Sequence, residues 1–106
     1  MKAILLGPDR DGLGDALETE GVELTRIEDS PNRPALEAAG ITDADTLVLT
    51  ETAGATAIPV AKDLTDDLHV VVYTDDDLPD FARGQADLIV DPQLLSAEAV
   101  AEELAA

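Results

Sequence analysis

The chain has 106 residues and carries 24 acidic against six basic side chains, for a formal net charge of −18. This length corresponds to one domain, and we expect residues 1–106 to form it. So acidic a surface argues against nucleic acid or an anionic membrane as partner, because phosphates are recognised by lysine and arginine. Cysteine is absent, which excludes disulfides, thiolate metal sites and a cysteine nucleophile.

The charge also bears on the environment of the protein. Two lysines stand against fifteen aspartates, a balance that resembles proteins of salt-accumulating halophiles. At 1 M salt the Debye length falls to about 3 Å, so we expect cooperative folding in molar KCl and lower stability in dilute buffer. Gly7-Pro8-Asp9 interrupts the first apolar run too early for a signal peptide, and we expect a cytoplasmic protein without a membrane span.

Short apolar runs alternate with helical patterns along the chain, which is typical of βαβ units in a parallel sheet. In chain order we expect a strand at 2–6, a helix at 12–20, a strand at 22–27, a loop at 30–33, a short helix at 34–39, a strand at 46–50, a helix at 53–64, a strand at 69–73, a helical turn at 79–83, a strand at 87–90 and a last helix capped by Ser96.

Right-handed crossovers and this order of elements favour a Rossmann-like three-layer fold, with five parallel strands in the order 3-2-1-4-5. Ligands of such sheets bind beyond the carboxyl ends of the strands, at the switch point beside the first strand. The residues expected there are 7–12, 28–29, 50–52, 74–77 and Asp91. Tyr73 and Phe81 are expected to pack at the end of the sheet.

The loop after the first strand carries part of a dinucleotide-binding pattern. Gly7 and Gly12 fit the first and third glycines of G-x-G-x-x-G, and Glu28 follows the second strand where a ribose-binding acid would lie. Together with residues 40–50 and 84–92, these features resemble the N-terminal nucleotide-binding domain of the TrkA/RCK family, which regulates potassium transport. The resemblance covers nearly the whole chain.

The resemblance implies a non-catalytic regulatory or adaptor protein that binds NAD or ATP/ADP weakly. The cofactor-binding residues that it implies are Gly7, Asp9, Arg10, Gly12, Glu28, Thr50 and Thr74. The chain departs from the family at two of them. Asp9 replaces the middle glycine and would repel a phosphate, and Thr74 stands where the family often has a basic residue. On charge alone, neutralising Asp9 is expected to leave stability unchanged or raised.

Other interpretations of the same residues remain open. The domain could bind no ligand and act through protein contacts, as a homodimer or with another partner. Gly7 and Gly12 could serve a tight turn alone. Glu28 and the acids at 75–77 could be solvated surface groups, and His69 a structural residue.

An enzyme is a further alternative, because Asp9-Arg10-Asp11-Gly12 resembles the DxDG motif of haloacid-dehalogenase-type phosphatases. Asp9 would then be the nucleophile, Asp11 the acid/base, and magnesium would bind the carboxylates. Gly7-Pro8 separates Asp9 from its strand, so we expect no catalysis and no resident metal.

Two further identities fit the sequence less well. A phosphorelay receiver needs an acid where Thr50 lies and a lysine after the fifth strand, and no lysine follows residue 90. Short halophile proteins of this kind sometimes carry the name CTP synthetase. That enzyme needs an amidotransferase cysteine and an ATP-phosphate loop, and this sequence has neither.

Overall fold

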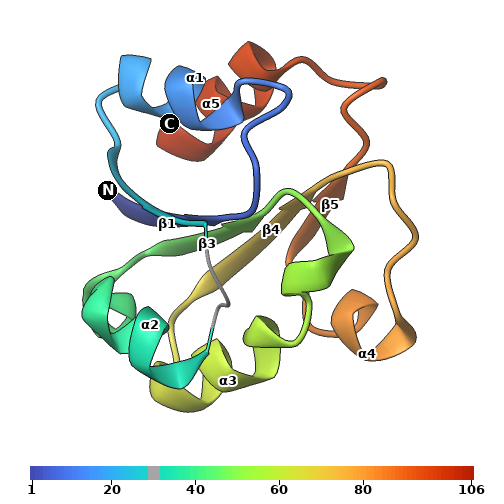
Figure 1. Ribbon diagram of the computed structural model, residues 1–106. Helices are drawn as coiled ribbons and strands as arrows, with labels where there is room; N and C mark the ends of the chain where they lie inside the picture. The colour runs from blue at the N-terminus through green and yellow to red at the C-terminus, as the bar shows by residue number, and fades with distance from the viewer. Residues whose placement is uncertain (29–31) are drawn as a thin grey trace.

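The computed structural model describes residues 1–28 and 32–106, in which a five-stranded parallel sheet lies between two layers of helices (Figure 1). The strands are β1 (Lys2–Leu6), β2 (Glu23–Ile27), β3 (Thr46–Leu49), β4 (His69–Tyr73) and β5 (Leu88–Val90). The helices are α1 (Leu13–Thr19), α2 (Arg33–Ala38), α3 (Ala57–Leu64), α4 (Asp80–Arg83) and α5 (Ala97–Ala105), with 3₁₀ turns η1 (Ile41–Asp43) and η2 (Thr52–Gly54). The predicted three-layer α/β class is confirmed.

The strand order is β2-β1-β3-β4-β5, so the predicted order 3-2-1-4-5 is wrong in its placement of β2 and β3. All four residues of β3 are buried, and β3 pairs with β1 on one side and β4 on the other. In β2, by contrast, Glu23, Thr25 and Arg26 are exposed. A strand buried on both faces belongs inside a parallel sheet, whereas a polar strand tolerates the edge.

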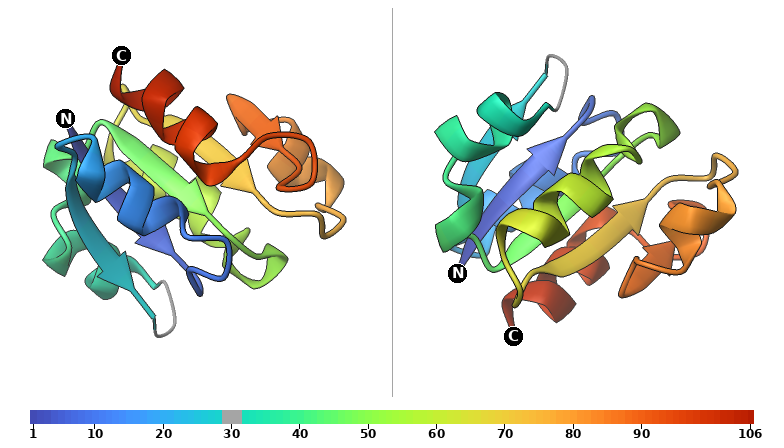
Figure 2. Two further views of the ribbon diagram at one scale, coloured as in Figure 1. Left: turned by 90° about the horizontal axis from the view of Figure 1, so that it is seen from above. Right: turned by 90° about the horizontal axis from the view of Figure 1, so that it is seen from below.

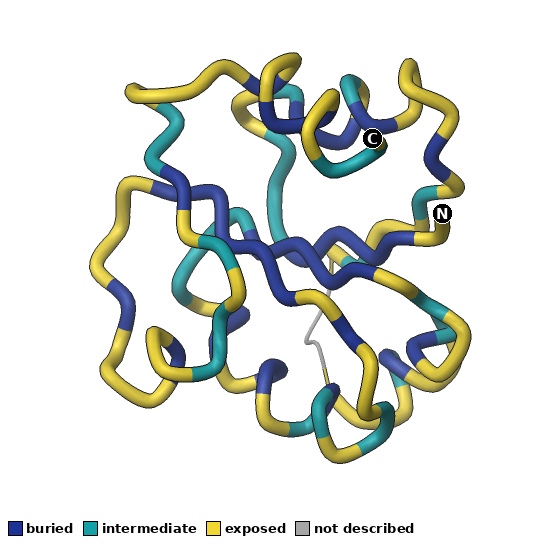
Figure 3. The backbone as a smooth tube through the Cα atoms, turned by 180° about the vertical axis from the view of Figure 1, so that it is seen from behind, coloured by how far each residue is buried: buried dark blue, intermediate teal, exposed yellow. Residues whose placement is uncertain are grey.

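Each face of the sheet has its own apolar core. Ala3 and Leu5 point to the layer of α1 and α5, whereas Ile4 and Leu6 point to the layer of α2, α3 and α4, because side chains alternate along a strand. Figures 1 and 2 show these two layers on opposite sides of the sheet. Figure 3 shows that buried backbone is concentrated in the sheet between them.

Side-chain caps set the start of two helices, α2 and α5. The Ser96 hydroxyl accepts a hydrogen bond from the Ala99 amide at 3.2 Å, so the predicted cap of α5 is confirmed. The helix predicted at 53–64 begins later, at Ala57, after the η2 turn. Pro59 therefore falls in the first turn of α3, where its missing N–H has no helical partner to lose.

Two expectations about residue placement have different outcomes. Tyr73 is buried as predicted, but Phe81 is 46% exposed on α4 and does not pack at the end of the sheet. Helix α4 has four residues, too few to turn both Ala82 and Phe81 inward, and Ala82 takes the core position. The predicted loop around Pro31 lies partly outside the described residues. In residues 1–28 and 32–106, no helix is long and apolar enough to cross a membrane.

Candidate functional site at the carboxyl ends of the strands

A cavity of about 300 Å³ lies where the sequence placed the ligand crevice, beyond the carboxyl ends of the strands. In this strand order the switch point falls between β1 and β3, so the loops after β1, β3, β4 and β5 all reach the cavity. Its lining includes four of the predicted site residues, Asp9, Arg10, Thr50 and Thr74. The fold therefore brings most of the predicted set together, and the contacts of each residue decide its role.

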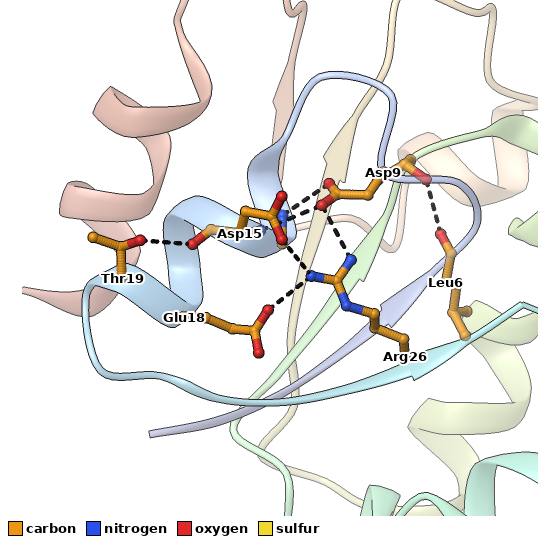
Figure 4. A network of polar contacts seen from close by, with 8 residues as sticks. Leu6, Asp9, Asp15, Glu18, Thr19 and Arg26 are labelled. Atoms are coloured by element: carbon orange, nitrogen blue, oxygen red, sulfur yellow. Dashed lines mark hydrogen bonds and ion pairs between the residues drawn. The ribbon is translucent and has the colours of Figure 1, made fainter.

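Asp9 is bound to the protein itself. Its carboxylate accepts hydrogen bonds from the amides of Gly14 and Asp15, at 2.9 and 3.3 Å, in the first turn of α1. The Arg26 guanidinium, from strand β2, donates to the same carboxylate at 3.1 Å (Figure 4). In dinucleotide-binding folds a phosphate occupies the start of the first helix. Here the carboxylate of Asp9 lies at that position.

These contacts also determine the ionisation of Asp9. Partial burial raises the pKa of the carboxyl group, but hydrogen bonds from the Gly14 amide, the Arg26 guanidinium and the Asp15 amide outweigh it. The pKa of Asp9 is therefore lower than usual, and the group is a carboxylate at neutral pH. A carboxylate held by three donors is a poor nucleophile, so the geometry does not favour the phosphatase alternative.

Arg26 is the residue that the sequence analysis missed. Its guanidinium also donates to Asp15 at 3.0 Å and to Glu18 at 2.8 Å, so it links strand β2 to helix α1 (Figure 4). Hydrogen bonds to Glu18 and Asp9 raise the pKa of Arg26 above its ordinary value. A signal was available, since Arg26 is the one basic residue in the predicted second strand, and Asp15 and Glu18 lie one turn apart.

Gly14 makes room for this network. A Cβ on Gly14 would lie 2.8 Å from the Arg26 Nη1 atom and 2.9 Å from the Asp9 carboxylate. The other glycines of the motif have backbone roles. Gly7 has φ +104° and would set a Cβ 2.5 Å from the Thr50 hydroxyl, and Gly12 precedes α1 with φ +76°. The tight-turn interpretation of the glycines therefore has direct structural support.

The hydroxyl groups of the crevice threonines form hydrogen bonds within the chain. Thr50 donates its hydroxyl to the Leu6 carbonyl at 3.1 Å, which ties β3 to β1. The Thr74 hydroxyl accepts the Asp76 amide at 3.2 Å, and the Asp76 carboxylate accepts the Thr52 hydroxyl at 3.2 Å. These bonds join the loops that follow β3 and β4.

The remaining predicted residues lie at the rim or outside. Arg10 is largely exposed and pairs with Glu51 at 3.7 Å. Glu28 is exposed at the end of β2 and does not belong to the described lining of the cavity. Asp29 lies outside the described residues. Within the described chain, no group of three histidine or acidic side chains could hold a metal ion.

The net charge around the cavity is negative. Asp9, Asp11, Asp75 and Asp76 line it, and Arg10 is the basic residue of the lining. Because Asp9 is paired with Arg26 and Arg10 is paired with Glu51, the groups of the lining left for a ligand are the carboxylates of Asp11 and Asp75. Such a cavity disfavours phosphate-bearing ligands.

Solved structures with the same fold come from signalling and pilus proteins. HP1043, an orphan response regulator of H. pylori, matches with a TM-score of 0.73 and 16% identity over 98% of this chain and 92% of that one. A protein described as a pilus assembly protein (cpaE) from Burkholderia thailandensis matches with 0.66 and 18% over 98% and 95%. A pilus assembly-related protein (BPSS2195) from Burkholderia pseudomallei matches with 0.69 and 17% over 98% and 86%.

These structures correct the TrkA/RCK resemblance. The chain has a receiver-like fold with strand order 2-1-3-4-5, and its structural neighbours are a response regulator and pilus proteins. Among the features that carried the resemblance, Gly7 and Gly12 serve the turn before α1, and Glu28 lies at the exposed end of β2. Nucleotide binding is therefore unsupported.

The receiver-like fold lacks two groups that the sequence analysis required of a phosphorelay receiver. Thr50 lies at the end of β3 where the acid is needed, and Asp91 follows β5 with no lysine after it. No curated protein matches the sequence. A family model matches residues 3–104, and the chain belongs to this family of unknown function, DUF7126.

Proposed function

We propose that the chain is a non-catalytic regulatory or adaptor domain that works through contact with another protein. One observation carries this proposal: the side chains of the predicted cofactor-binding residues that line the crevice are bound to the chain itself. Asp9 is held by α1 and Arg26, Thr50 by β1, and Thr74 by the Asp76 amide. A crevice whose polar groups are already paired has few free groups with which to recognise or transform a small molecule.

The fold supports the same proposal. The likeness to an orphan response regulator extends over nearly the full length of both chains. With a threonine in place of the acceptor acid and no lysine after β5, this version of the fold would work without phosphoryl transfer. Such a domain would then act through contact with another protein.

Phosphoryl acceptance provides the sharpest test. The protein is incubated with acetyl phosphate and Mg²⁺ in high KCl, and its intact mass is measured, with a receiver domain that has the acid and the lysine as positive control. We expect no phosphoryl adduct on this chain. A stoichiometric adduct would refute the proposal, as would magnesium-dependent phosphoester hydrolysis that Asp9→Asn abolishes and Asp66→Asn does not.

A second measurement tests the adaptor role directly. The protein is immobilised and then incubated with a cell extract in molar KCl. We expect it to retain a partner protein. The retained protein is then purified and titrated against the domain to establish a direct contact. Failure to retain any protein over a range of KCl concentrations would count against an adaptor.

A further inference from the structure

The two edge strands of the sheet differ in how open they are to a further strand. β5 has three residues and is soon followed by Pro92, and short strands and prolines are common protections of a sheet edge. β2 has five residues, contains no proline and pairs with β1 along its whole length. Figure 2 shows β2 as the outermost strand on its side of the molecule. β2 is therefore the edge that accepts another strand more readily.

Alternate residues of β2 direct their backbone groups away from β1. The Glu23 amide donates to the Met1 carbonyl at 3.0 Å, which places Glu23 among the residues that bond to β1. In a parallel ladder such residues alternate along the strand. The amides and carbonyls of Leu24 and Arg26 therefore point to the open side of β2. None of the hydrogen bonds within the described chain uses these outward groups.

The outward groups of β2 are complementary to the same groups of a second copy. When two β2 strands run antiparallel with Thr25 opposite Thr25, Leu24 of each strand lies opposite Arg26 of the other. In an antiparallel pair, residues opposed in this way exchange both of their N–H···O bonds. Every outward amide and carbonyl of both copies then has a partner, across a two-fold axis that passes between the Thr25 residues.

The side chains of β2 also fit this pairing. Glu23 of one copy lies opposite Ile27 of the other, and Thr25 lies opposite its own symmetry mate, so no two like charges face each other directly. Opposed threonines are a favourable cross-strand pair. Leu24 and Ile27 are half-buried in the single copy and gain cover from the facing side chains. Arg26 is the cation of the strand, and it is already paired with acids of its own α1.

The net charge determines the conditions under which two copies meet. Each chain carries −18, and the two-fold axis brings the α1 helices of both copies to the same face of the joined sheet. At 1 M salt the Debye length is about 3 Å, so repulsion is confined to charges in near contact. The pairing should therefore strengthen as the KCl concentration rises.

We propose that two copies of the chain associate by antiparallel pairing of their β2 strands, which joins the two sheets into one continuous sheet. This inference goes beyond the proposed function, because it names a second copy as a partner and the strand that binds it. The β strands of the two copies run in opposite directions, so the two crevices open at opposite ends of the dimer.

Disulfide cross-linking tests the pairing directly, because the chain has no cysteine of its own. Thr25→Cys places two sulfur atoms across the axis, with the Cα atoms about 4.5 Å apart, a spacing that a disulfide can bridge. We expect a covalent dimer under mild oxidation in molar KCl. Glu23→Cys is the matched control, since its symmetry mate lies four residues, or about 14 Å, away along the strands. It should cross-link at least about tenfold more slowly.

The register has its own test. Glu23 lies opposite Ile27 in the proposed pair, so a mixture of Glu23→Cys and Ile27→Cys proteins should form the mixed disulfide dimer in preference to either homodimer. Intact mass distinguishes the three products. A mixture that yields the three dimers in random proportion would contradict the register.

A proline separates the outer edge of β2 from its ladder to β1. Leu24→Pro removes an outward amide and no bond to β1, so the domain should still fold. We expect the dimer dissociation constant, from sedimentation equilibrium in molar KCl, to rise at least about tenfold, because two symmetry-related hydrogen bonds are lost. Leu24→Ala shortens the same side chain but keeps the amide, and should have a smaller effect.

A second variant covers the case in which circular dichroism shows that Leu24→Pro does not fold. Thr25→Asp sets two carboxylates directly opposite each other and should also raise the dissociation constant at least about tenfold. Thr65→Asp adds the same charge at the end of α3, away from β2, and should leave the dimer unchanged.

Three results would overturn the inference. The first is a wild-type protein that sediments as a monomer in molar KCl up to millimolar concentration. The second is cross-linking of Thr25→Cys no faster than that of Glu23→Cys, which would assign any association to another surface. The third is protection of the Leu24 and Arg26 amides from hydrogen exchange only when a captured partner protein is added, which would make β2 the site of that protein. The acetyl phosphate measurement does not depend on β2, so either proposal can fail while the other stands.

Discussion

The contacts of Asp9 in the fold give it a role different from the one that its place in the glycine motif suggests. At its position in the glycine motif, Asp9 is a negative charge that would repel a phosphate. In the fold it supplies the start of α1 with the acceptor that a phosphate supplies elsewhere, and it is paired with Arg26. The expectation from charge alone, that neutralising Asp9 costs nothing, is therefore replaced by its opposite.

Replacing Asp9 by alanine should destabilise the protein. The change removes the acceptor of two α1 amides and leaves Arg26 with fewer partners, so we expect a loss of about 1–2 kcal/mol in the free energy of unfolding. Asp15→Ala is the matched control. It removes an exposed partner of Arg26 without touching an amide acceptor, and should cost less than about 0.5 kcal/mol. Equal losses in urea melts of the two variants would contradict the capping role.

The stabilising effect of Asp9 should depend on pH. Its pKa is lowered in the folded protein, so its contribution is complete above the unfolded value of about 3.9 and is lost as the pH falls through the folded pKa. The stability difference between wild type and Asp9→Asn should therefore be constant near neutrality and shrink below about pH 4. Urea melts of both proteins over this range measure the difference. A gap that grows on acidification would show that the sign is wrong.

Gly14→Ala tests whether the contacts of Asp9 and Arg26 or the helix propensity of residue 14 contributes more to stability. Alanine favours a helix over glycine by about 1 kcal/mol. Here, however, the new Cβ would displace the Arg26 guanidinium and the Asp9 carboxylate, and hydrogen bonds to charged groups contribute about 1.5–3 kcal/mol. We expect net destabilisation by about 1 kcal/mol in thermal or urea melts. In Arg26→Ala protein the same substitution should become neutral or stabilising.

At the level of the elements, single side chains link neighbouring strands, helices and loops. Arg26 joins β2 to α1, Thr50 joins β3 to β1, and Tyr73 joins β4 to the loop before α5. The bonds of Thr50 and Tyr73 link residues 44 and 22 positions apart in sequence, whereas Arg26 links two consecutive elements. These links explain how a short chain with small helices keeps its loops fixed at the crevice.

Tyr73→Phe should loosen the loop that carries Leu94 and Leu95. Loss of the hydroxyl leaves the Leu95 carbonyl without that donor, at a cost of about 1 kcal/mol. Amide hydrogen exchange should increase in residues 91–96 more than in the sheet. Unchanged exchange in that loop would contradict the role of the tyrosine.

The same variant has a pH signature. Burial, and then the charges of Asp11, Glu98 and Asp91, raise the pKa of Tyr73. A raised folded pKa means that the stability due to the neutral phenol is complete below about pH 10 and is lost as the pH rises further. The phenylalanine variant should lack this alkaline loss in urea melts. An identical alkaline decline in both proteins would assign it to other groups.

At the level of the whole molecule, charge repulsion opposes folding. The net charge of −18 on so small a chain should make the melting temperature rise with KCl concentration. Circular dichroism melts across KCl concentrations measure this. Replacing exposed Asp66, Asp67 and Asp75 by asparagine removes three negative charges and should reduce the slope. A melting temperature that is unchanged or higher in dilute buffer would contradict the halophile interpretation.

The sequence by itself determined the elements and the layers. Alternation of apolar runs with helical patterns is a local property, so all five strands and the cap at Ser96 could be predicted. The position of the crevice followed as well, because the carboxyl ends of parallel strands always meet at one edge of the sheet. Asp9, Arg10, Thr50 and Thr74 were placed there correctly on this ground.

Tertiary structure decided the strand order and the roles of the site residues. Whether β2 or β3 takes the edge of the sheet depends on which strand can be buried on both faces, and β2, with its polar residues, takes the edge. The partner of Asp9 is Arg26, which is 17 residues away and faces Asp9 only after β2 pairs with β1. Local patterns fix what each segment is, whereas distant contacts fix whether its polar groups remain free for a ligand.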